Sequence, residues 1–199
     1  MAALGFDVAR PLYVGVDDGA DPVLPFGGTL FAYADETKAA NELGEDFAPV
    51  YMRAGRLFDS TAAAYEPDAV QALRAFYEGN EDALREQWGA YLYDTLQEEE
   101  AEELGYEDLG DLVDSKINSL DYQLFEQALR EGWHHDMMGY SGQDGDEFIA
   151  ESLADAGFDA VRFQPLFGDS SDSYYVIGNI ANLQLAWDKL DERINEARV

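Results

Sequence analysis

The sequence predicts an α+β fold with a split, β-rich core that is interrupted by an acidic helical insertion. Residues 27–59 read as a Gly-Gly turn, a short strand, an amphipathic helix and a second strand. Residues 156–187 form another strand-rich segment, and between the two segments apolar residues recur with a period near 3.6. We therefore expect a single domain with its core at about 10–60 and 153–187 and its helical insertion at about 65–150.

The length and composition fit a folded protein with one sizeable core. The chain has 199 residues, of which 47% are hydrophobic. It contains no cysteine, which excludes disulfides, thiol nucleophiles and cysteine-ligated zinc. No apolar run approaches the roughly 18 residues of a membrane span, and the N-terminus lacks a basic-then-apolar secretory pattern. We expect a soluble, cytoplasmic protein that does not enter a membrane.

The charge is strongly one-sided, with 42 acidic residues against 12 basic ones and a formal net charge of -30. Such a surface repels nucleic-acid phosphates and acidic membranes, so neither is an expected direct partner. Three explanations stay open. The acids adapt the protein to high salt, they imitate the phosphates of DNA toward a basic partner, or they form a solvated face without specific use.

The N-terminal segment is predicted to alternate strands with one helix. Strands are expected at 10–16, 30–33 and 49–53, because β-branched and aromatic residues are bounded there by Gly, Pro and Asp. Asp35 is the expected N-cap of a helix that ends before Gly44.

The insertion is predicted to contain three helical stretches. Pro67 suits the first turn of the first stretch, and Asn80 is the expected cap of the second. The second stretch is expected to end in the exposed, glutamate-rich run 97–103, and the third covers 112–129. Apolar stripes on these helices are expected to pack in an ordinary core.

The C-terminal segment is predicted to complete the core. A helix that ends at Gly157 is followed by strands at 161–163 and 174–177. A polar loop at 168–173 separates the two strands, and the tail 186–199 is predicted to be a charged amphipathic helix.

Metal and nucleophile chemistry have weak support in the sequence. His134 and His135 are adjacent, so their side chains leave a helix about 100° apart and do not readily share one metal ion. Exposed or hydrogen-bonded histidines are expected instead, and no metal site is predicted. Two acidic clusters resemble calcium loops only loosely and lack the EF-hand spacing. These clusters are Asp17, Asp18 and Asp21, and Asp144, Asp146 and Glu147.

Short motifs follow a fixed order along the two β-rich segments. A Tyr-x-Gly strand comes first, then an aromatic strand with Asp and a helix alanine, then Val-Tyr-Met, Leu-Phe-Asp, Gly-Phe-Asp-Ala-Val and a closing Tyr-Val-Ile strand. The residues concerned are Tyr13, Gly15, Phe31, Tyr33, Asp35, Ala40, 50–52, 57–59, 157–161 and 175–186. This order resembles the ADP-ribosyltransferase-like domains of phage and mobile-element polyvalent proteins.

The resemblance implies a cleft between two small sheets that holds NAD in a bent form. It implies that Tyr13 and Gly15 of the first strand, with Phe31 and Tyr33 of the second, shape the cofactor pocket. The aromatic rings of the second strand would stack on nicotinamide. The core is accordingly expected to be a split, two-sheet, ADP-ribosyltransferase-like structure.

The resemblance also implies where the catalytic acid lies. The carboxylate that stabilises the developing ribosyl cation is expected just before the last strand, as Asp172 or Asp169. Val14 departs from the family pattern, because a histidine that holds the adenosine ribose stands there in the family. Valine cannot form that hydrogen bond.

Three functions follow from these observations. The first is an NAD-dependent mono-ADP-ribosyltransferase of the phage or mobile-element type that modifies a macromolecular target. The second is a non-catalytic acidic inhibitor or DNA mimic that binds a basic partner, such as a nucleic-acid-binding host defence protein. The third is a halophile-adapted, virion-associated domain whose charge serves solubility. Label transfer from NAD and the salt dependence of binding distinguish them.

Overall fold

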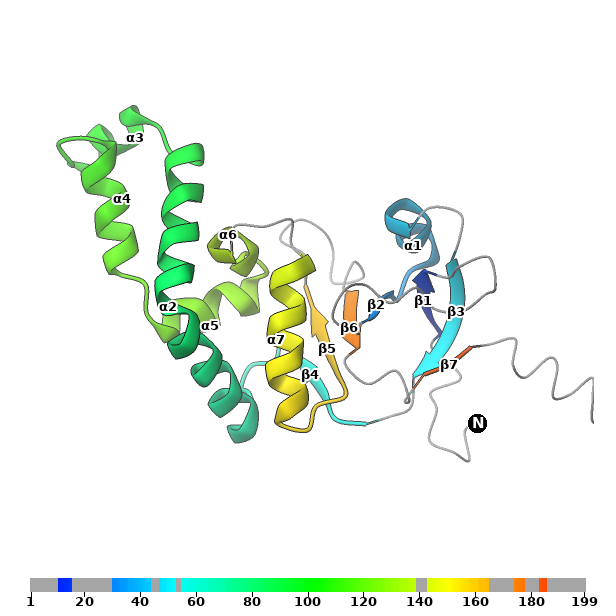
Figure 1. The fold of residues 1–199 in the computed structure, drawn as a ribbon. Helices are drawn as coiled ribbons and strands as arrows, with labels where there is room; N and C mark the ends of the chain where they lie inside the picture. Colours follow the sequence, from blue (N-terminus) through cyan, green and yellow to red (C-terminus); the bar gives the residue numbers. More distant parts are fainter. Residues whose placement is uncertain are drawn as a thin grey trace, which may run out of the picture.

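The protein has an α+β fold in which one sheet lies beside a group of helices (Figure 1). The computed structural model describes residues 11–15, 30–43, 47–52, 55–138, 143–164, 174–177 and 183–185. The strands are β1 (Leu12–Gly15), β2 (Leu30–Tyr33), β3 (Phe47–Met52), β4 (Leu57–Asp59), β5 (Ala160–Phe163), β6 (Tyr174–Ile177) and β7 (Leu183–Leu185). The helices are α1 (Glu36–Leu43), α2 (Pro67–Thr95), α3 (Glu98–Leu104), α4 (Leu109–Asn118), α5 (Tyr122–Glu131), α6 (His134–Met138) and α7 (Gln143–Asp155).

The strands from both ends of the chain form one seven-stranded sheet of order β4-β5-β6-β2-β1-β3-β7. β2 and β6 pair antiparallel, with Tyr33 opposite Tyr174 and Ala32 opposite Tyr175. β4 and β5 are parallel, and the other pairs are antiparallel. The expectation of two sheets is therefore corrected: β6 hydrogen-bonds to both β5 and β2 and joins all the described strands in a single sheet.

The two faces of the sheet belong to different apolar clusters. Successive residues of a strand point to opposite faces, so Leu30 and Phe31 of β2 separate. Phe31 and Val176 pack in the cluster that includes the helices. Leu30, together with Val14 and Val50, packs in the cluster on the other face.

Most of the predicted core elements are present. The strands predicted at 30–33, 161–163 and 174–177 are β2, β5 and β6. The helix predicted after Asp35 is α1, and the Asp35 carboxylate accepts a hydrogen bond of 2.9 Å from the amide of Lys38, as an N-cap does. The strands β4 and β7 were not predicted, because three residues are too few to show a period of two.

α2 is one continuous helix of 29 residues, whereas the sequence predicted a new helix capped by Asn80. The Asn80 side chain instead donates a hydrogen bond of 2.8 Å to the carbonyl of Phe76, inside the helix. Buried residues form one stripe before and after this point, and burying that stripe outweighs the preference of Asn for a cap. Among the described residues, no helix combines the length and apolar character needed to cross a bilayer.

The glutamate-rich run after α2 is a separate helix, α3, rather than the exposed end of α2. Leu96 is extended, and Gln97 and Glu100 form a capping box at the start of α3. The predicted third stretch is likewise two helices. Asp121 accepts a hydrogen bond of 2.9 Å from the amide of Leu124 and begins α5 after α4 has ended.

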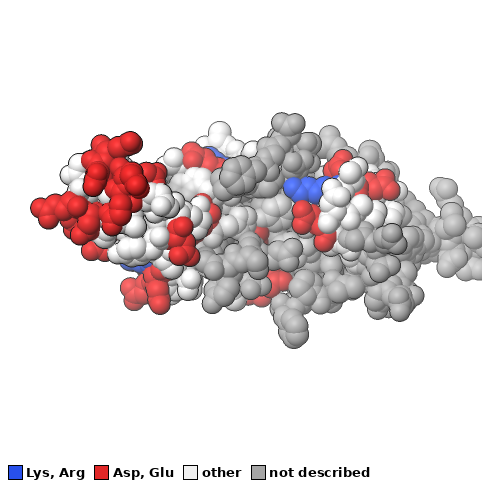
Figure 2. Space-filling model, turned by 90° about the horizontal axis from the view of Figure 1, so that it is seen from above, with Lys and Arg blue, Asp and Glu red and all other residues white. Residues whose placement is uncertain are grey.

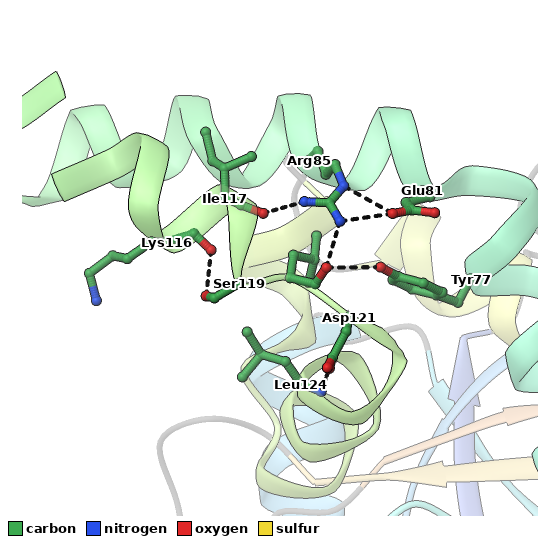
Figure 3. A network of polar contacts seen from close by, with 9 residues as sticks. Tyr77, Glu81, Arg85, Lys116, Ile117, Ser119, Asp121 and Leu124 are labelled. Atoms are coloured by element: carbon green, nitrogen blue, oxygen red, sulfur yellow. Dashed lines mark hydrogen bonds and ion pairs between the residues drawn. The ribbon is translucent and has the colours of Figure 1, made fainter. Parts of the chain in front are cut away.

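Arg85 of α2 fixes the end of α4 (Figure 3). Its guanidinium donates to the backbone carbonyls of Ile117 and Leu120, the latter at 2.6 Å, and pairs with Glu81 at 2.8 Å. The hydroxyl of Tyr77 donates to the same Leu120 carbonyl at 3.2 Å. Carbonyls at a helix C-terminus lack partners within the helix, so a cation there satisfies them and complements the helix dipole. α2 thereby determines where α4 lies.

The return from the helices to the sheet is fixed at Gly157 and Asp159. Gly157 has a φ of 87°, a left-handed conformation that favours glycine, and follows α7 as predicted. The amide of Arg56 donates to the Asp159 carboxylate and the amide of Asp159 donates to the Arg56 carbonyl, both at 2.8 Å. These bonds bring β4 against β5. The predicted loop 168–173 and tail helix 186–199 lie outside the described residues.

Candidate functional site

The aromatic residues predicted to contact nicotinamide lie in the core. Phe31 is 7% exposed and Tyr33 is 4% exposed. Their rings each lie 6.4 Å from the ring of Tyr174, centroid to centroid. Tyr13 is half-buried, and its ring meets that of Phe47 edge-on at 5.9 Å. As they stand, Phe31 and Tyr33 pack against protein and have no surface open to a ligand ring.

The other residues of the expected NAD site are placed only in part. Gly15 ends β1, close to Leu43 of α1. Val14, at the position of the family histidine, is fully buried on the opposite face from Phe31. Asp169 and Asp172 lie outside the described residues, just before β6 in the chain. Of the two acidic clusters that loosely resemble calcium loops, the described residues also leave out Asp17, Asp18, Asp21 and the side chain of Asp144.

Two grooves run along α2, away from the expected NAD residues. One, of about 640 Å³, lies between α2 and α7 and is lined by residues such as Gln71 and Ser152. The other, of about 270 Å³, is lined by Met137, Met138 and the exposed Phe148. Neither of these two grooves reaches the strands β1 or β2.

Three side chains converge on the buried carboxylate of Asp146. The Nε2 atom of His134 lies 2.7 Å from its Oδ1. The Nε2 atom of His135 lies 3.2 Å from Oδ1 and 3.1 Å from Oδ2. The hydroxyl of Tyr174 donates to Oδ2 at 2.5 Å and lies 3.1 Å from the Nε2 atom of His135. These four residues are called the histidine–aspartate cluster below.

Three elements bring the histidine–aspartate cluster together. α5 ends at Gly132, whose φ of 84° turns the chain so that the two histidines begin the short helix α6. Asp146 comes from the first turns of α7, and Tyr174 begins β6. The ring of Phe163 of β5 stacks on two rings of the cluster, with its centroid 5.3 Å from that of His134 and 5.6 Å from that of Tyr174. The rings are therefore held by packing as well as by hydrogen bonds.

Burial and mutual hydrogen bonds set the protonation of the cluster. Burial lowers the pKa of His134. Burial also acts to lower the pKa of His135, but the hydrogen bond and charge of Asp146 outweigh it, so that pKa is raised. For Asp146, burial acts to raise the pKa, and the hydrogen bonds from the two histidines outweigh it and lower it. Burial and the nearby Asp146 raise the pKa of Tyr174, which keeps its proton.

The cluster can orient a proton or ligate a cation. The side chain of His135 is 22% exposed, whereas those of His134 and Asp146 are 0% and 1% exposed. A carboxylate behind a partly exposed imidazole orients that ring and stabilises its charged form. The cluster also ties α6, α7 and β6 together, so it supports the fold in any case.

The sequence had indicated part of this cluster. The prediction of hydrogen-bonded histidines is confirmed. The expectation that adjacent histidines point apart was wrong, because their ring centroids lie 4.0 Å apart and both rings reach Asp146. An imidazole is long enough to turn toward a shared partner despite the angle at the backbone. The convergence of Tyr174 had no signal in the sequence, since it depends on how β6 packs on α7.

The far end of the helical part is a dense acidic surface. Figure 2 shows Asp and Glu side chains gathered at the end of the molecule where Figure 1 places α3 and α4. Nine acidic residues, all exposed, and no basic ones lie between positions 97 and 114. They are Glu98, Glu99, Glu100, Glu102, Glu103, Glu107, Asp108, Asp111 and Asp114. We call this surface the acidic end.

Two large apolar side chains are exposed beside these carboxylates. Leu104, the last residue of α3, is 64% exposed. Tyr93 of α2 is 52% exposed and extends toward Gly110 of α4. Single exposed apolar residues are common on folded proteins, so these two mark a binding site only in combination with the surrounding charge.

Comparison of this chain with protein-family models, with curated proteins and with solved structures gave no match.

Proposed function

We propose that this protein works by binding a positively charged macromolecule, namely a nucleic-acid-binding protein, through the acidic end. The observation that supports the proposal is the concentration of nine exposed carboxylates on α3, α4 and their connection, between positions 97 and 114, where the one basic residue of α4, Lys116, comes after them. Some acids elsewhere have a basic partner, as where Arg56 pairs with Glu66 at 2.7 Å and Arg130 pairs with Glu126 at 2.7 Å.

The fold itself uses only some of these carboxylates. Three of them accept hydrogen bonds from backbone amides at the starts of α3 and α4. These three are Glu98, Glu100 and Asp108. For the other six, no hydrogen bond to the backbone is seen among the described residues. Glu99 and Asp111 lie in first helical turns, where a negative charge is favourable, but the mutual repulsion of the whole group acts against the folded state. A bound basic surface would remove that repulsion, so the unpaired charge favours association.

The composition of the acidic end also indicates what kind of partner fits. Carboxylates around a binding surface attract a basic protein, speed its approach and repel nucleic acid itself. Tyr93 and Leu104 supply apolar area that a partner can bury, and tyrosine is frequent among residues that dominate binding energy. A protein that normally binds phosphates presents the complementary basic surface.

The test compares the chain with a variant in which the six free acids are neutralised. The substitutions are Glu99→Gln, Glu102→Gln, Glu103→Gln, Glu107→Gln, Asp111→Asn and Asp114→Asn. The immobilised wild-type chain is used to capture a basic partner from an extract, and binding of that purified partner is then measured with and without competing double-stranded DNA. We expect the wild type to bind, the variant to lose binding, and DNA to displace the partner.

A control variant with the same change in net charge distinguishes an effect of the acidic end from an effect of the total charge. It neutralises six exposed acids outside the acidic end. These are Glu42, Glu78, Asp82, Glu86, Glu151 and Asp155. Equal loss of binding in both variants, or binding that DNA does not affect, would refute the proposal and favour a charge that serves solubility in high salt.

The order of the strands supports a second candidate, an ADP-ribosyltransferase-like fold with NAD-dependent transferase activity. β6, β2 and β1, which carry the motifs, are neighbours in the sheet. Asp169 and Asp172 precede β6, and β6 pairs with the strand of Phe31 and Tyr33. Binding of NAD would require those rings to become accessible.

Label transfer from NAD tests this second candidate. The chain is incubated with labelled NAD and an extract, beside Asp172→Asn, Asp169→Asn and the control Asp155→Asn. A transferase using these acids labels a target with the wild type and the control, and loses labelling with Asp172→Asn or Asp169→Asn. No transfer by the wild type rules the activity out, and it leaves the binding proposal unaffected.

A further inference from the structure

The histidine–aspartate cluster carries an inference that is independent of the acidic end. We propose that His134, His135 and Asp146 form a binding site for one divalent transition-metal ion, of which Zn²⁺ is the best-fitting example. One ligand atom from each of the three residues lies within 4.8 Å of the other two, in the part of the chain that the structure describes. The ligands come from two helices, α6 and α7, that the rest of the fold holds in place.

The position of the proton on His134 favours a bound cation. A neutral imidazole carries one N–H and one lone pair. When the proton is on Nε2, the Nδ1 atom carries a buried lone pair. This Nδ1 atom has no hydrogen-bond partner of good geometry in the described part of the chain, although the backbone of Ala128 is near enough to act on the ring. With the proton on Nδ1, the Nε2 lone pair faces the carboxylate of Asp146 at 2.7 Å. Either tautomer leaves an unfavourable contact.

A metal ion removes this conflict. It accepts electron pairs from both Nε2 and the carboxylate, and it leaves the proton on Nδ1, toward the backbone. Metal-bound histidines commonly direct their other ring nitrogen to a backbone carbonyl or a carboxylate in this way. A charged imidazolium that donates to the Asp146 carboxylate would satisfy the same atoms, and titration with Zn²⁺ distinguishes it from a metal site.

The donor set selects the class of metal. Two imidazole nitrogens and one carboxylate oxygen suit zinc and its neighbours, whereas calcium and magnesium prefer oxygen ligands alone. Tyr174, whose hydroxyl touches both Asp146 and His135, adds an oxygen beside the three ligands. Ligands of a tetrahedral zinc ion lie about 3.3 Å apart, given bonds near 2.0–2.1 Å. Asp146 would therefore move back from His134 by roughly half an ångström on binding.

The route to the site passes His135. Its side chain is the only one of the three ligands that is more than 1% exposed. Replacing it removes a ligand without opening a cavity in the core, so His135→Gln is the informative variant. Asp155→Asn is the matched control, because Asp155 is an exposed acid at the other end of α7 from Asp146 and is outside the three-ligand group.

The experiment measures metal binding directly. The 199-residue chain is purified, stripped with a chelator and titrated with Zn²⁺ or Mg²⁺ by calorimetry, and bound metal is counted by mass spectrometry after dialysis. We expect one Zn²⁺ per chain, no Mg²⁺, and a visible absorption band when Co²⁺ replaces Zn²⁺. Loss of one ligand in His135→Gln should weaken Zn²⁺ binding by about 100-fold or more, and Asp155→Asn should bind as the wild type does.

Several results would overturn the site. They are absence of Zn²⁺ binding by the wild type, equal binding by the wild type and His135→Gln, and binding that depends on Asp155 as strongly as on His135. Circular dichroism and thermal unfolding establish that each variant is folded before titration. Asp146→Asn, if folded, should also lose Zn²⁺, and retention of full affinity in that variant would contradict the assignment.

Discussion

At the scale of single residues, Arg85 sets the position of the acidic end. Its contacts to the carbonyls of Ile117 and Leu120 attach α4 to α2. We expect Arg85→Met to lower the free energy of unfolding by about 1–3 kcal/mol, because two part-buried carbonyls lose a charged donor, although that of Leu120 keeps another donor, the Tyr77 hydroxyl. Urea unfolding measures this. Lys116→Met is the control, since the Lys116 side chain points away from these contacts (Figure 3), and an equal loss in both variants would show that Arg85 has no special part.

Tyr65 and Tyr122 make a second residue-scale prediction, on alkaline stability. Burial raises the pKa of each phenol to about 12. The unfolded chain loses these protons near pH 10, so their contribution is complete below about pH 10 and is lost as the pH rises toward about 12. We expect each phenol to account for a loss of roughly 1–2 kcal/mol, after discounting for partial exposure.

The measurement is urea unfolding at a series of alkaline pH values. The double variant Tyr65→Phe, Tyr122→Phe has no phenols at these sites and should show a shallower decline than the wild type. Parallel curves for the two proteins would mean that these groups titrate normally in the folded state.

At the scale of elements, side-chain caps decide where the helices around the acidic end begin. Asp121 caps α5, so we expect Asp121→Ala to cost about 1 kcal/mol in the free energy of unfolding. Asp114 lies on the exposed side of α4 and caps no helix. The substitution Asp114→Ala should therefore change the free energy of unfolding by less than about 0.5 kcal/mol. Thermal unfolding of the two variants provides the comparison, and an equal shift would exclude a capping contribution.

Caps and stripes also explain which elements the sequence could predict. Asp35 was recognised as a cap because an apolar pattern begins after it, whereas Asn80 was misread because the apolar stripe of α2 continues through it. Leu96 and Asp121 break helices inside stretches that looked uniform, since the buried residues on either side keep a similar spacing. The spacing of apolar residues therefore predicted where the helical regions lie, but it did not predict how many helices they contain.

At the scale of the whole molecule, long-range pairing limited what could be predicted. The sequence indicated that the two distant β-rich segments meet, and β2 pairs with β6 as neighbours in the sheet. That β6 joins all the described strands into one sheet depends on hydrogen bonds with both β5 and β2, which leave no local pattern. For the same reason, the meeting of Tyr174 with His135 and Asp146 was not foreseen.

The net charge makes a prediction for the molecule as a whole. The formal net charge is -30, and the excess carboxylates repel one another at low ionic strength. Added salt should therefore raise the free energy of unfolding. The six-acid variant should gain less from salt than the wild type between about 0.05 M and 1 M, measured by thermal unfolding. A wild-type stability that does not change with salt would show that the carboxylates do not strain the fold.

Binding through the acidic end is tested most directly by the salt dependence of Kd for the captured partner. Calorimetric titrations of the wild type, the six-acid variant and the control variant are made at about 0.1 M and 0.5 M salt. We expect the Kd of the wild type and of the control to rise at least about tenfold with salt. The six-acid variant should bind weakly at both concentrations. An affinity that is unchanged by salt, or that is the same in all three proteins, would contradict recognition by α3 and α4.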